Sequence, residues 1–401
     1  MTLPLAIFDQ AEYLTIHQIP AHILPQQIKD YMHSIEFLKS YAGRPGTFNS
    51  YRREVERLFQ WTWLIHRASL QQLNRHDLEK YIKFCQHPPK EWIADYKVPR
   101  FKEKQGERKP NPEWRPFVMP YKKNQSEKEQ QFILSQGAIQ EIFAILSTYF
   151  NFLIADEYIF SNPIALMRQK SKFIQKSQQA APIRRLSLLQ WQMVLETVEQ
   201  LASQEPQKHE RTRFILHAMY GMYLRISELT ASDRWIPTMD DFAKDHYGNW
   251  WFTTVGKGNK RRQIAVSELV LESLKRWRIF LGLPALPTPG ENQYLIPKIK
   301  GVGPIAETVT IRRLIQQCFD LAVLRLKQQQ FDEEAQHLEV ATVHWLRHTS
   351  ISEDVKIRPR EHVRDDAGHA SSATTDRYID VELTERHRSA QNKKILPVAE
   401  N

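Results

Sequence analysis

The spacing of apolar residues in the first part of the chain predicts four helices. Apolar positions recur every three to four residues over residues 26–41, and a second stripe starts after Thr47, which we expect to cap its helix. Glycine and proline between the two stripes would end the first helix. The same period returns over residues 77–84 and 138–154. These patterns predict a small all-α bundle.

The second part of the chain mixes helices with strands. Helical periods cover residues 189–201 and 310–327, and an apolar helix starts at Arg213. Residues 250–255 and 262–266 form two strand-like runs with a Gly-Lys-Gly turn between them, which predicts an antiparallel hairpin. We therefore expect a mainly α protein whose second domain is mixed α+β with a small antiparallel sheet.

A polar and basic stretch divides the two parts. Residues 169–185 are poor in large apolar residues, as linkers are. The first 25 residues are short of any clear pattern. The predicted organisation is an N-terminal segment (1–25), a helical domain (26–168) with an insertion at about 87–130, a linker (169–185) and a second domain (186–401).

The charge balance of the chain indicates the kind of partner that it binds. The 401 residues contain 56 Lys and Arg against 46 Asp and Glu, a formal net charge of +10. A surplus of this size points to a polyanion, and nucleic acid is the commonest one. A protein that is merely basic is the alternative.

The predicted insertion, residues 87–130, adds to this surplus. It is polar, punctuated by proline and rich in Lys and Arg. Loops of this length are usually functional or disordered. Its basic residues and Trp114 are candidates for touching DNA, and a solvated insertion is the alternative that the sequence leaves open.

The cysteines and the apolar runs indicate a compartment. Cys85 and Cys318 are far apart and belong to no C-x-x-C pair, so the sequence suggests neither a disulfide framework nor a zinc site. No apolar run reaches the roughly 18 residues that a membrane helix needs, and the N-terminus lacks a signal pattern. We expect a protein of the reducing cytoplasm.

A histidine and an arginine near residue 345 are the first candidates for chemistry. Thr342 is a plausible N-cap, and His344 and Arg347 follow at helical spacing i, i+3, so their side chains leave one face of the predicted helix. An imidazole beside a guanidinium suits a phosphate. Such a short motif also arises by chance, so its meaning depends on its surroundings.

Arg225 is a second candidate. Apolar residues flank it, which places it at the edge of a core, and a half-buried arginine needs a partner. Glu228 lies three residues further on. The two residues form either a plain structural pair, which this stretch by itself favours, or a guanidinium that Glu228 holds toward a phosphate.

Three further residues have side chains that suit phosphate chemistry. The Gly-Lys-Gly turn would hold the ammonium of Lys257 forward, as a proton donor or simply as a charged hairpin tip. His369 follows small residues, which allow a close backbone approach. Tyr378 lies on a short helix that Thr374 or Thr375 would cap, and its hydroxyl is a possible nucleophile.

Together these pieces resemble the tyrosine recombinase (phage integrase) family, whose ordered signature they repeat. The matching motifs are Leu-Arg-Ile-Ser-Glu-Leu at 224–229, Gly-Lys-Gly at 256–258, His-Trp-Leu-Arg-His-Thr at 344–349, Gly-His at 368–369 and Thr-Thr-Asp-Arg-Tyr at 374–378. The resemblance covers about residues 185–385, and the helices of 26–168 look more loosely like the family's all-α core-binding (SAM-like) domain. Tyr223 stands where the family commonly has glycine, and Ala367 where it often has leucine.

The resemblance implies cleavage of one DNA strand through a 3′-phosphotyrosyl link, then attack by the 5′-hydroxyl of a partner strand. It implies no metal or ATP, and four protomers acting on two duplexes. It assigns Arg225 and Arg347 to holding the phosphate and Lys257 to the general acid. His344 would accept the tyrosine proton and His369 would donate a hydrogen bond to the phosphate. Tyr378 would be the nucleophile.

Other basic residues are expected to bind backbone phosphates of double-stranded DNA without reading its sequence. These are Lys260, Arg261 and Arg262 beside the hairpin turn, and Arg52 and Arg53 on the helical domain. Two alternatives stay open. One is strand cleavage of the type IB topoisomerase or telomere-resolvase kind. The other is a catalytically idle DNA-binding protein of the same fold.

Overall fold

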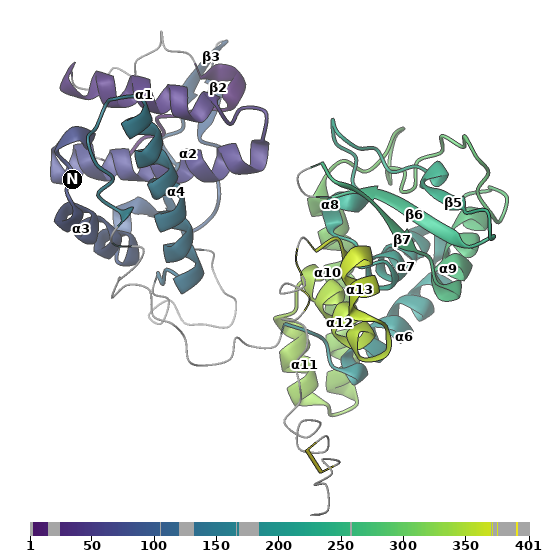
Figure 1. Ribbon diagram of the computed structural model, residues 1–401. Coiled ribbons are helices and arrows are strands. Elements are labelled where there is room, and N and C mark those ends of the chain that lie inside the picture. Colours follow the sequence, from purple (N-terminus) through teal and green to yellow (C-terminus); the bar gives the residue numbers. More distant parts are fainter. Residues whose placement is uncertain are drawn as a thin grey trace, which may run out of the picture. The chain divides into compact units, whose positions relative to one another are not determined.

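The computed structural model describes residues 3–14, 25–104, 106–119, 132–165, 167, 184–256, 259–369, 371, 375 and 390–391. The chain divides into two compact units, Met1–Ala180 and Ala181–Asn401 (Figure 1). Each unit contains a hydrophobic core of its own. The division falls inside the stretch expected to be a linker, residues 169–185. The fold prediction is confirmed, because the described chain is mainly helical with small sheets.

Helices form most of the first unit. Its α-helices are α1 (Ile28–Lys39), α2 (Pro45–Trp61), α3 (Arg75–Gln86) and α4 (Gln136–Ala155). Short 3-10 and π turns lie at Ala11–Tyr13, Pro25–Gln27, Thr62–His66, Leu70–Gln72 and Lys90–Trp92. The expected cap at Thr47 is wrong, because α2 starts earlier, at Pro45. Proline suits the first turn of a helix, where its missing N–H is not needed.

The N-terminal segment packs into this unit. Ile7 and Phe8 are buried, and their backbone N–H groups both donate to the carboxylate of Glu56, which is itself fully buried. The same carboxylate forms an ion pair with Arg100 of the insertion. One buried acid therefore joins the N-terminus, α2 and the insertion.

The described part of the insertion is folded. Strand β1 (Ile93–Ala94) pairs in parallel with β4 (Phe117–Val118), and β2 (Phe101–Lys104) forms an antiparallel hairpin with β3 (Glu107–Pro110). Trp114 is 7% exposed, and its ring lies 4.6 Å below the guanidinium of Arg100. Trp114 therefore supports the insertion from inside, and the idea that its ring touches DNA is wrong for this structure.

Helix α4 is long and apolar enough to cross a membrane by length and composition, contrary to the expectation from the sequence. Half of its most apolar window is buried inside the unit. Its buried side chains pack in the same core as those of α1 and α2. This burial is what the core helix of a globular domain shows.

The second unit places helices against a small sheet. Its helices are α6 (Leu188–Gln204), α7 (Pro206–Gly221), α8 (Ile226–Leu229), α9 (Glu268–Phe280), α10 (Thr308–Gln328), α11 (Asp332–Glu339), α12 (Val343–Ile357) and α13 (Arg360–Ala367), with a 3-10 turn at Met239–Asp241. The antiparallel sheet has the order β5-β6-β7, from β5 (Phe242–Lys244), β6 (Trp250–Val255) and β7 (Arg261–Ala265). The predicted hairpin is β6–β7.

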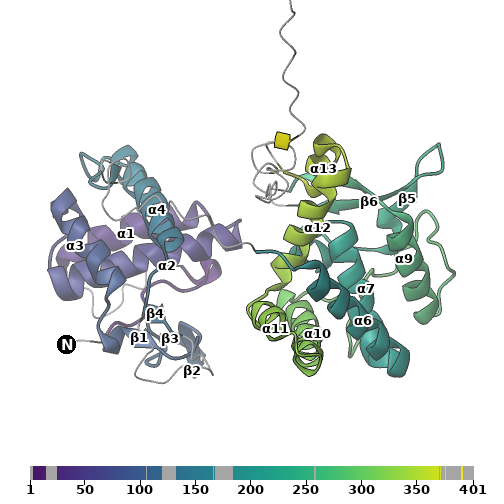
Figure 2. The same cartoon turned by 90° about the horizontal axis from the view of Figure 1, so that it is seen from below.

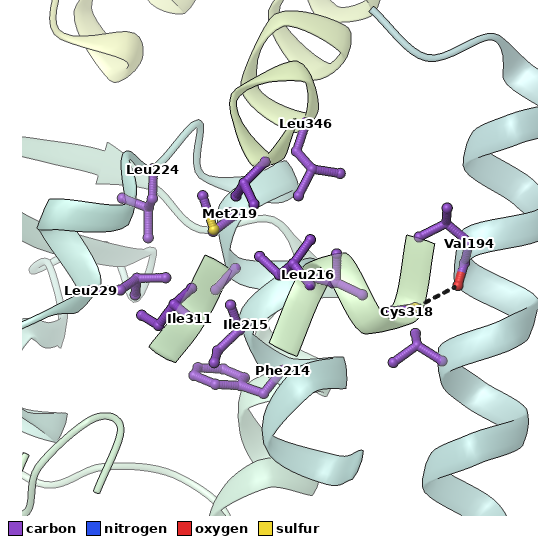
Figure 3. Close-up of a cluster of buried hydrophobic side chains, with 14 of the residues drawn as sticks. Val194, Phe214, Ile215, Leu216, Met219, Leu224, Leu229, Ile311, Cys318 and Leu346 are labelled. Atoms are coloured by element: carbon purple, nitrogen blue, oxygen red, sulfur yellow. Dashed lines mark hydrogen bonds between the residues drawn. The ribbon is translucent and has the colours of Figure 1, made fainter. Parts of the chain in front are cut away.

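Helix α7 is the centre of this unit, since it contacts α6, α9, α10 and α12 (Figure 2). Figure 3 shows its Phe214, Ile215, Leu216 and Met219 among side chains from α10 and α12. The packing continues past the end of α7. Leu224 and Leu229 are buried as well, on either side of Arg225. The core therefore fixes the turn that carries Arg225.

Candidate active site

Arg225 lies at the tight passage between α7 and α8. It is the N-cap residue of α8, and its backbone N–H donates to Oε2 of Glu228 at 2.8 Å. Its Nη1 donates to Oε1 of the same carboxylate at 3.0 Å, while 30% of the side chain stays exposed. The structural pair that the sequence suggested is present, and it leaves part of the Arg225 side chain exposed.

Glu228 also holds a second arginine. Arg262 of β7 donates to both carboxylate oxygens of Glu228, at 2.7 and 2.9 Å, and its Nε donates to the carbonyl of Asp366 at 3.0 Å. Burial opposes ionisation of Glu228, but the hydrogen bonds and charges of Arg262 and Arg225 outweigh it and lower the pKa of the carboxyl. One buried anion therefore joins α8 to β7, and Arg262 extends the contacts to the end of α13.

Arg347 of α12 is held in a different way. Its side chain is almost fully buried, and its Nη1 and Nη2 donate to the backbone carbonyls of Tyr223 and Ala367. The second of these bonds is 2.5 Å long. Carbonyl oxygens orient the guanidinium and carry no net charge. The cation is therefore fixed between the turn before Arg225 and the end of α13.

Histidines surround the two arginines. His344 is exposed, and its ring packs edge-on against that of His348 at 4.7 Å. Partial burial and the neighbouring Arg347 and Arg225 lower the pKa of His344. Burial, followed by Arg347 and Arg225, lowers the pKa of His369 to about 4. These imidazoles are therefore neutral near pH 7 and able to accept a proton.

His369 reaches the last part of the site. Its Nδ1 lies 2.9 Å from the hydroxyl of Thr375. Thr375 is buried and helical, whereas we expected it or Thr374 to cap the tyrosine-bearing helix. Lys257 and Tyr378, the expected acid and nucleophile, lie outside the described residues, as does Thr374.

The candidate DNA contacts beside the hairpin separate into two kinds. Lys260 and Arg261 are exposed beyond the turn, which the bond from the N–H of Gly256 to the carbonyl of Lys260 closes at 2.9 Å. Arg262 points inward to Glu228, with a side chain 10% exposed. Its geometry favours a positioning role over the phosphate contact that we expected.

The two candidates in the first unit are engaged within it. Arg52 donates to the carbonyl of Asp9 at 2.6 Å and to the side chain of Asn49 at 2.7 Å. Arg53 forms ion pairs with Glu54 and Glu141. Any contact of these two arginines with DNA would have to compete with these bonds.

A chain of polar contacts behind the site was missed by the sequence analysis. Arg358 donates to the hydroxyl of Tyr223 at 2.6 Å and to the carboxylate of Asp366 at 2.6 Å. The Tyr223 hydroxyl in turn donates to Asp354. The one signal available was Tyr223 itself, a large residue where the family commonly has glycine.

The arrangement suits one kind of ligand. Guanidiniums and neutral imidazoles converge from α8, α12 and the segment after α13, which matches the charge of a phosphodiester. Among the described residues, no group of three or more His, Cys, Asp or Glu side chains is placed to hold a metal ion.

The comparisons with known proteins agree with this chemistry. Residues 190–385 match the model of the phage integrase family. None of the curated proteins matches the chain in sequence. The family match identifies residues 190–385 as the catalytic domain of an enzyme that breaks and rejoins DNA. The domain that contains these residues belongs to the phage integrase family, the tyrosine recombinases.

Solved structures share the fold over most of the chain. A post-cleavage complex of the XerH site-specific recombinase with its difH substrate is 14% identical, with a TM-score of 0.58, over 96% of this chain and 92% of that one. The Tn1549 transposon integrase in complex with circular intermediate DNA is 16% identical, with a TM-score of 0.51, over 90% and 99%. A lambda integrase dimer bound to a COC′ core site is 12% identical, with a TM-score of 0.52, over 95% and 85%.

Proposed function

We propose that this tyrosine recombinase is a site-specific recombinase or integrase that works through a covalent 3′-phosphotyrosyl intermediate. The observation that carries the proposal is the placement of Arg225 and Arg347. Each is restrained by its own set of bonds, and both lie close enough to His344 and His369 to lower the pKa of those imidazoles. Restrained cations stabilise the charge of a pentacoordinate phosphorane without reorganising during the reaction.

The proposed strand cleavage exchanges one phosphate ester bond for another. The hydroxyl oxygen of Tyr378 attacks phosphorus, the bond from phosphorus to the 5′-oxygen breaks, and the 3′-phosphotyrosyl link forms. His344 accepts the tyrosine proton, and its lowered pKa keeps the ring unprotonated near pH 7, as a proton acceptor must be. Lys257 gives a proton to the departing 5′-oxygen, and His369 donates a hydrogen bond to the phosphate. The second strand's 5′-hydroxyl reverses the step.

The partner we propose is double-stranded DNA, with four protomers acting on two duplexes in the cytoplasm. The structures of similar fold include recombinases bound to DNA, and the net charge of +10 favours such a polyanion. The buried, unpaired thiols of Cys85 and Cys318 suit a reducing compartment.

Trapping the covalent adduct tests the proposal. The protein is incubated with nicked duplexes that span the ends of its own gene, and the products are run on a denaturing gel. We expect a slow, protease-sensitive DNA band for the wild type and for Tyr247→Phe, which alters an exposed tyrosine. Tyr378→Phe should give none. An adduct that survives in Tyr378→Phe would exclude Tyr378 as the nucleophile.

Strand exchange separates the proposal from its alternatives. Two duplexes with matching sites should yield recombinant products. Relaxation of supercoiled DNA or hairpin formation from one duplex, with no exchange, would indicate a topoisomerase or a resolvase. DNA binding with no adduct on any tested site would indicate an idle binder.

A further inference from the structure

Tyr223 has a backbone conformation that its side chain does not favour. Its φ is +50°, in the left-handed region that glycine occupies most easily. The residue is fully buried, so the conformation is imposed by its surroundings. A large residue held in this way is a reason to ask what its side chain does.

The side chain of Tyr223 joins the helices that carry the rest of the site. Its ring packs with Ile351 of α12 and with Val363 and Ala367 of α13. Its hydroxyl donates to Asp354, seven residues after Arg347 on α12. The same oxygen accepts a 2.6 Å hydrogen bond from Arg358, which follows the last residue of α12.

The contacts continue to β7, the strand whose Arg262 bonds Glu228. Arg358 also donates to Oδ2 of Asp366 at 2.6 Å, and Oδ1 of Asp366 accepts the backbone N–H of Ala265 in β7 at 3.3 Å. The hydroxyl of Tyr223 therefore lies in a set of bonds that connects α12, α13 and β7.

The backbone of Tyr223 contacts one of the phosphate-holding arginines directly. Its carbonyl oxygen accepts a hydrogen bond from Nη1 of Arg347. Arg225 is two residues away along the chain. Tyr223 thus restrains the position of one phosphate-holding arginine relative to the other. A rotation of this peptide group would move the bond that fixes Arg347.

We propose that Tyr223 is a positioning residue: its hydroxyl, bound by Asp354 and Arg358, fixes the peptide group that holds Arg347 beside Arg225. The proposal rests on the proposed strand-cleavage function. A general structural role is the competing explanation, and it predicts lower stability without a slower reaction in the folded molecules.

Single-turnover cleavage of nicked duplexes at saturating DNA tests this role. Tyr223→Phe keeps the ring and the carbonyl and removes the hydroxyl. Because small misplacements of reacting groups slow catalysis strongly, we expect its cleavage rate constant to fall by about tenfold or more. We expect its DNA dissociation constant to stay within about twofold, because ground-state binding is spread over many phosphate contacts.

Two further sets of variants make the result specific. Asp354→Asn keeps an oxygen that accepts a hydrogen bond from the Tyr223 hydroxyl, so this variant should retain most of the cleavage rate. Asp354→Ala removes that oxygen and should match Tyr223→Phe. Combining Tyr223→Phe with Asp354→Ala should slow the reaction no further. Tyr149→Phe removes a buried hydroxyl that bonds Ser34 in the first unit, so it controls for lost stability.

The outcomes are distinct. A Tyr223→Phe rate constant equal to that of the wild type, or an effect on the active fraction alone, would overturn the positioning role. A wild type that never cleaves would refute the proposed function instead. In that case the guanidinium NMR signal of Arg347, assigned with Arg347→Lys, decides: a shift or broadening in Tyr223→Phe and not in Tyr149→Phe supports the role, and unchanged spectra overturn it.

Discussion

At the scale of single residues, two arginines of similar expected role are held by different chemistry. Arg225 shares the carboxylate of Glu228 with Arg262, whereas Arg347 is oriented by carbonyl oxygens. The carboxylate offsets part of the positive charge, and the carbonyls leave it intact. A phosphate between them would therefore meet one cation whose charge a carboxylate partly offsets and one cation that backbone carbonyls orient.

Replacing Glu228 tests the first of these arrangements. Glu228→Gln leaves two arginines beside a neutral amide, so we expect the free energy of unfolding to fall by about 3 kcal/mol, as for a broken buried ion pair. We also expect strand cleavage to slow, because Arg225 loses its restraint. Denaturant unfolding and single-turnover cleavage measure the two effects. Glu272→Gln, on the exposed face of α9, should change neither.

The pH dependence of stability follows from the same residue. The pKa of Glu228 is lowered from the ordinary 4.5 in the folded protein. Its contribution to stability is therefore complete above pH 4.5 and is lost as the pH falls through the lowered value. Acid unfolding of Glu228→Gln should lack this component, and an identical acid profile for the two proteins would contradict the assignment.

His369 makes a second prediction at this scale. Because its pKa is lowered to about 4, the DNA-free protein should keep this imidazole neutral down to about pH 5. Below pH 6.5 the unfolded chain binds this proton and the folded protein does not, so the contribution to stability falls with pH. An NMR titration, assigned with His369→Gln, checks it. A midpoint near 6.5 would show that neither burial nor the nearby arginines lower the pKa of the ring.

At the scale of elements, the strands and helices were easier to predict than their ends. Residues 250–255 form β6 as expected, and Thr342 does occupy the N-cap of α12, although its side chain makes no capping bond. The hairpin of the insertion was missed, because β2 and β3 are polar and mostly exposed. Alternating apolar residues, the usual signal of a strand, are absent from these two strands.

The end of α13 offers a test with a matched control. A Cβ at Gly368, where φ is +65°, would lie 2.8 Å from Cδ of Arg262. Gly282 has a similar φ of +75° with nothing within 4 Å. Gly282→Ala should cost about 1 kcal/mol from backbone strain. Gly368→Ala should cost about 1–2 kcal/mol more, because the new methyl group displaces Arg262.

Both glycine variants are compared by denaturant unfolding and by cleavage. We expect Gly368→Ala to lose activity and Gly282→Ala to keep it. Equal losses of stability, with activity intact in both, would show that the contact between α13 and Arg262 has no influence on the site.

At the scale of the whole molecule, the order of motifs along the chain predicts which residues take part in the proposed reaction. It does not predict which way their side chains point. Arg261 and Arg262 are adjacent in sequence, and alternation along β7 turns the first to solvent and the second to Glu228. The inward partner lies 34 residues away, so no local pattern reveals it. The role of Tyr223 depends on contacts of the same long-range kind.

This difference predicts how DNA binding responds to salt. Lys260→Ala and Arg261→Ala should each weaken binding to any duplex and reduce the slope of log K against log salt by about 0.9 per lost phosphate contact. Arg262→Ala should instead lower stability and slow cleavage. Fluorescence anisotropy at several salt concentrations measures the slopes. If Arg262→Ala reduced the salt slope while keeping full stability, Arg262 would be shown to contact a phosphate after all.

The left-handed backbone at Tyr223 also limits how this sequence can change. A glycine there would relieve a conformational cost of about 1–2 kcal/mol, yet it would remove a buried ring and strip Asp354 and Arg358 of a common partner. The locally easier residue is therefore the worse one in this background. A stable glycine variant would require compensating substitutions on α12 and α13, so the neighbours of Tyr223 limit which residue this position can hold.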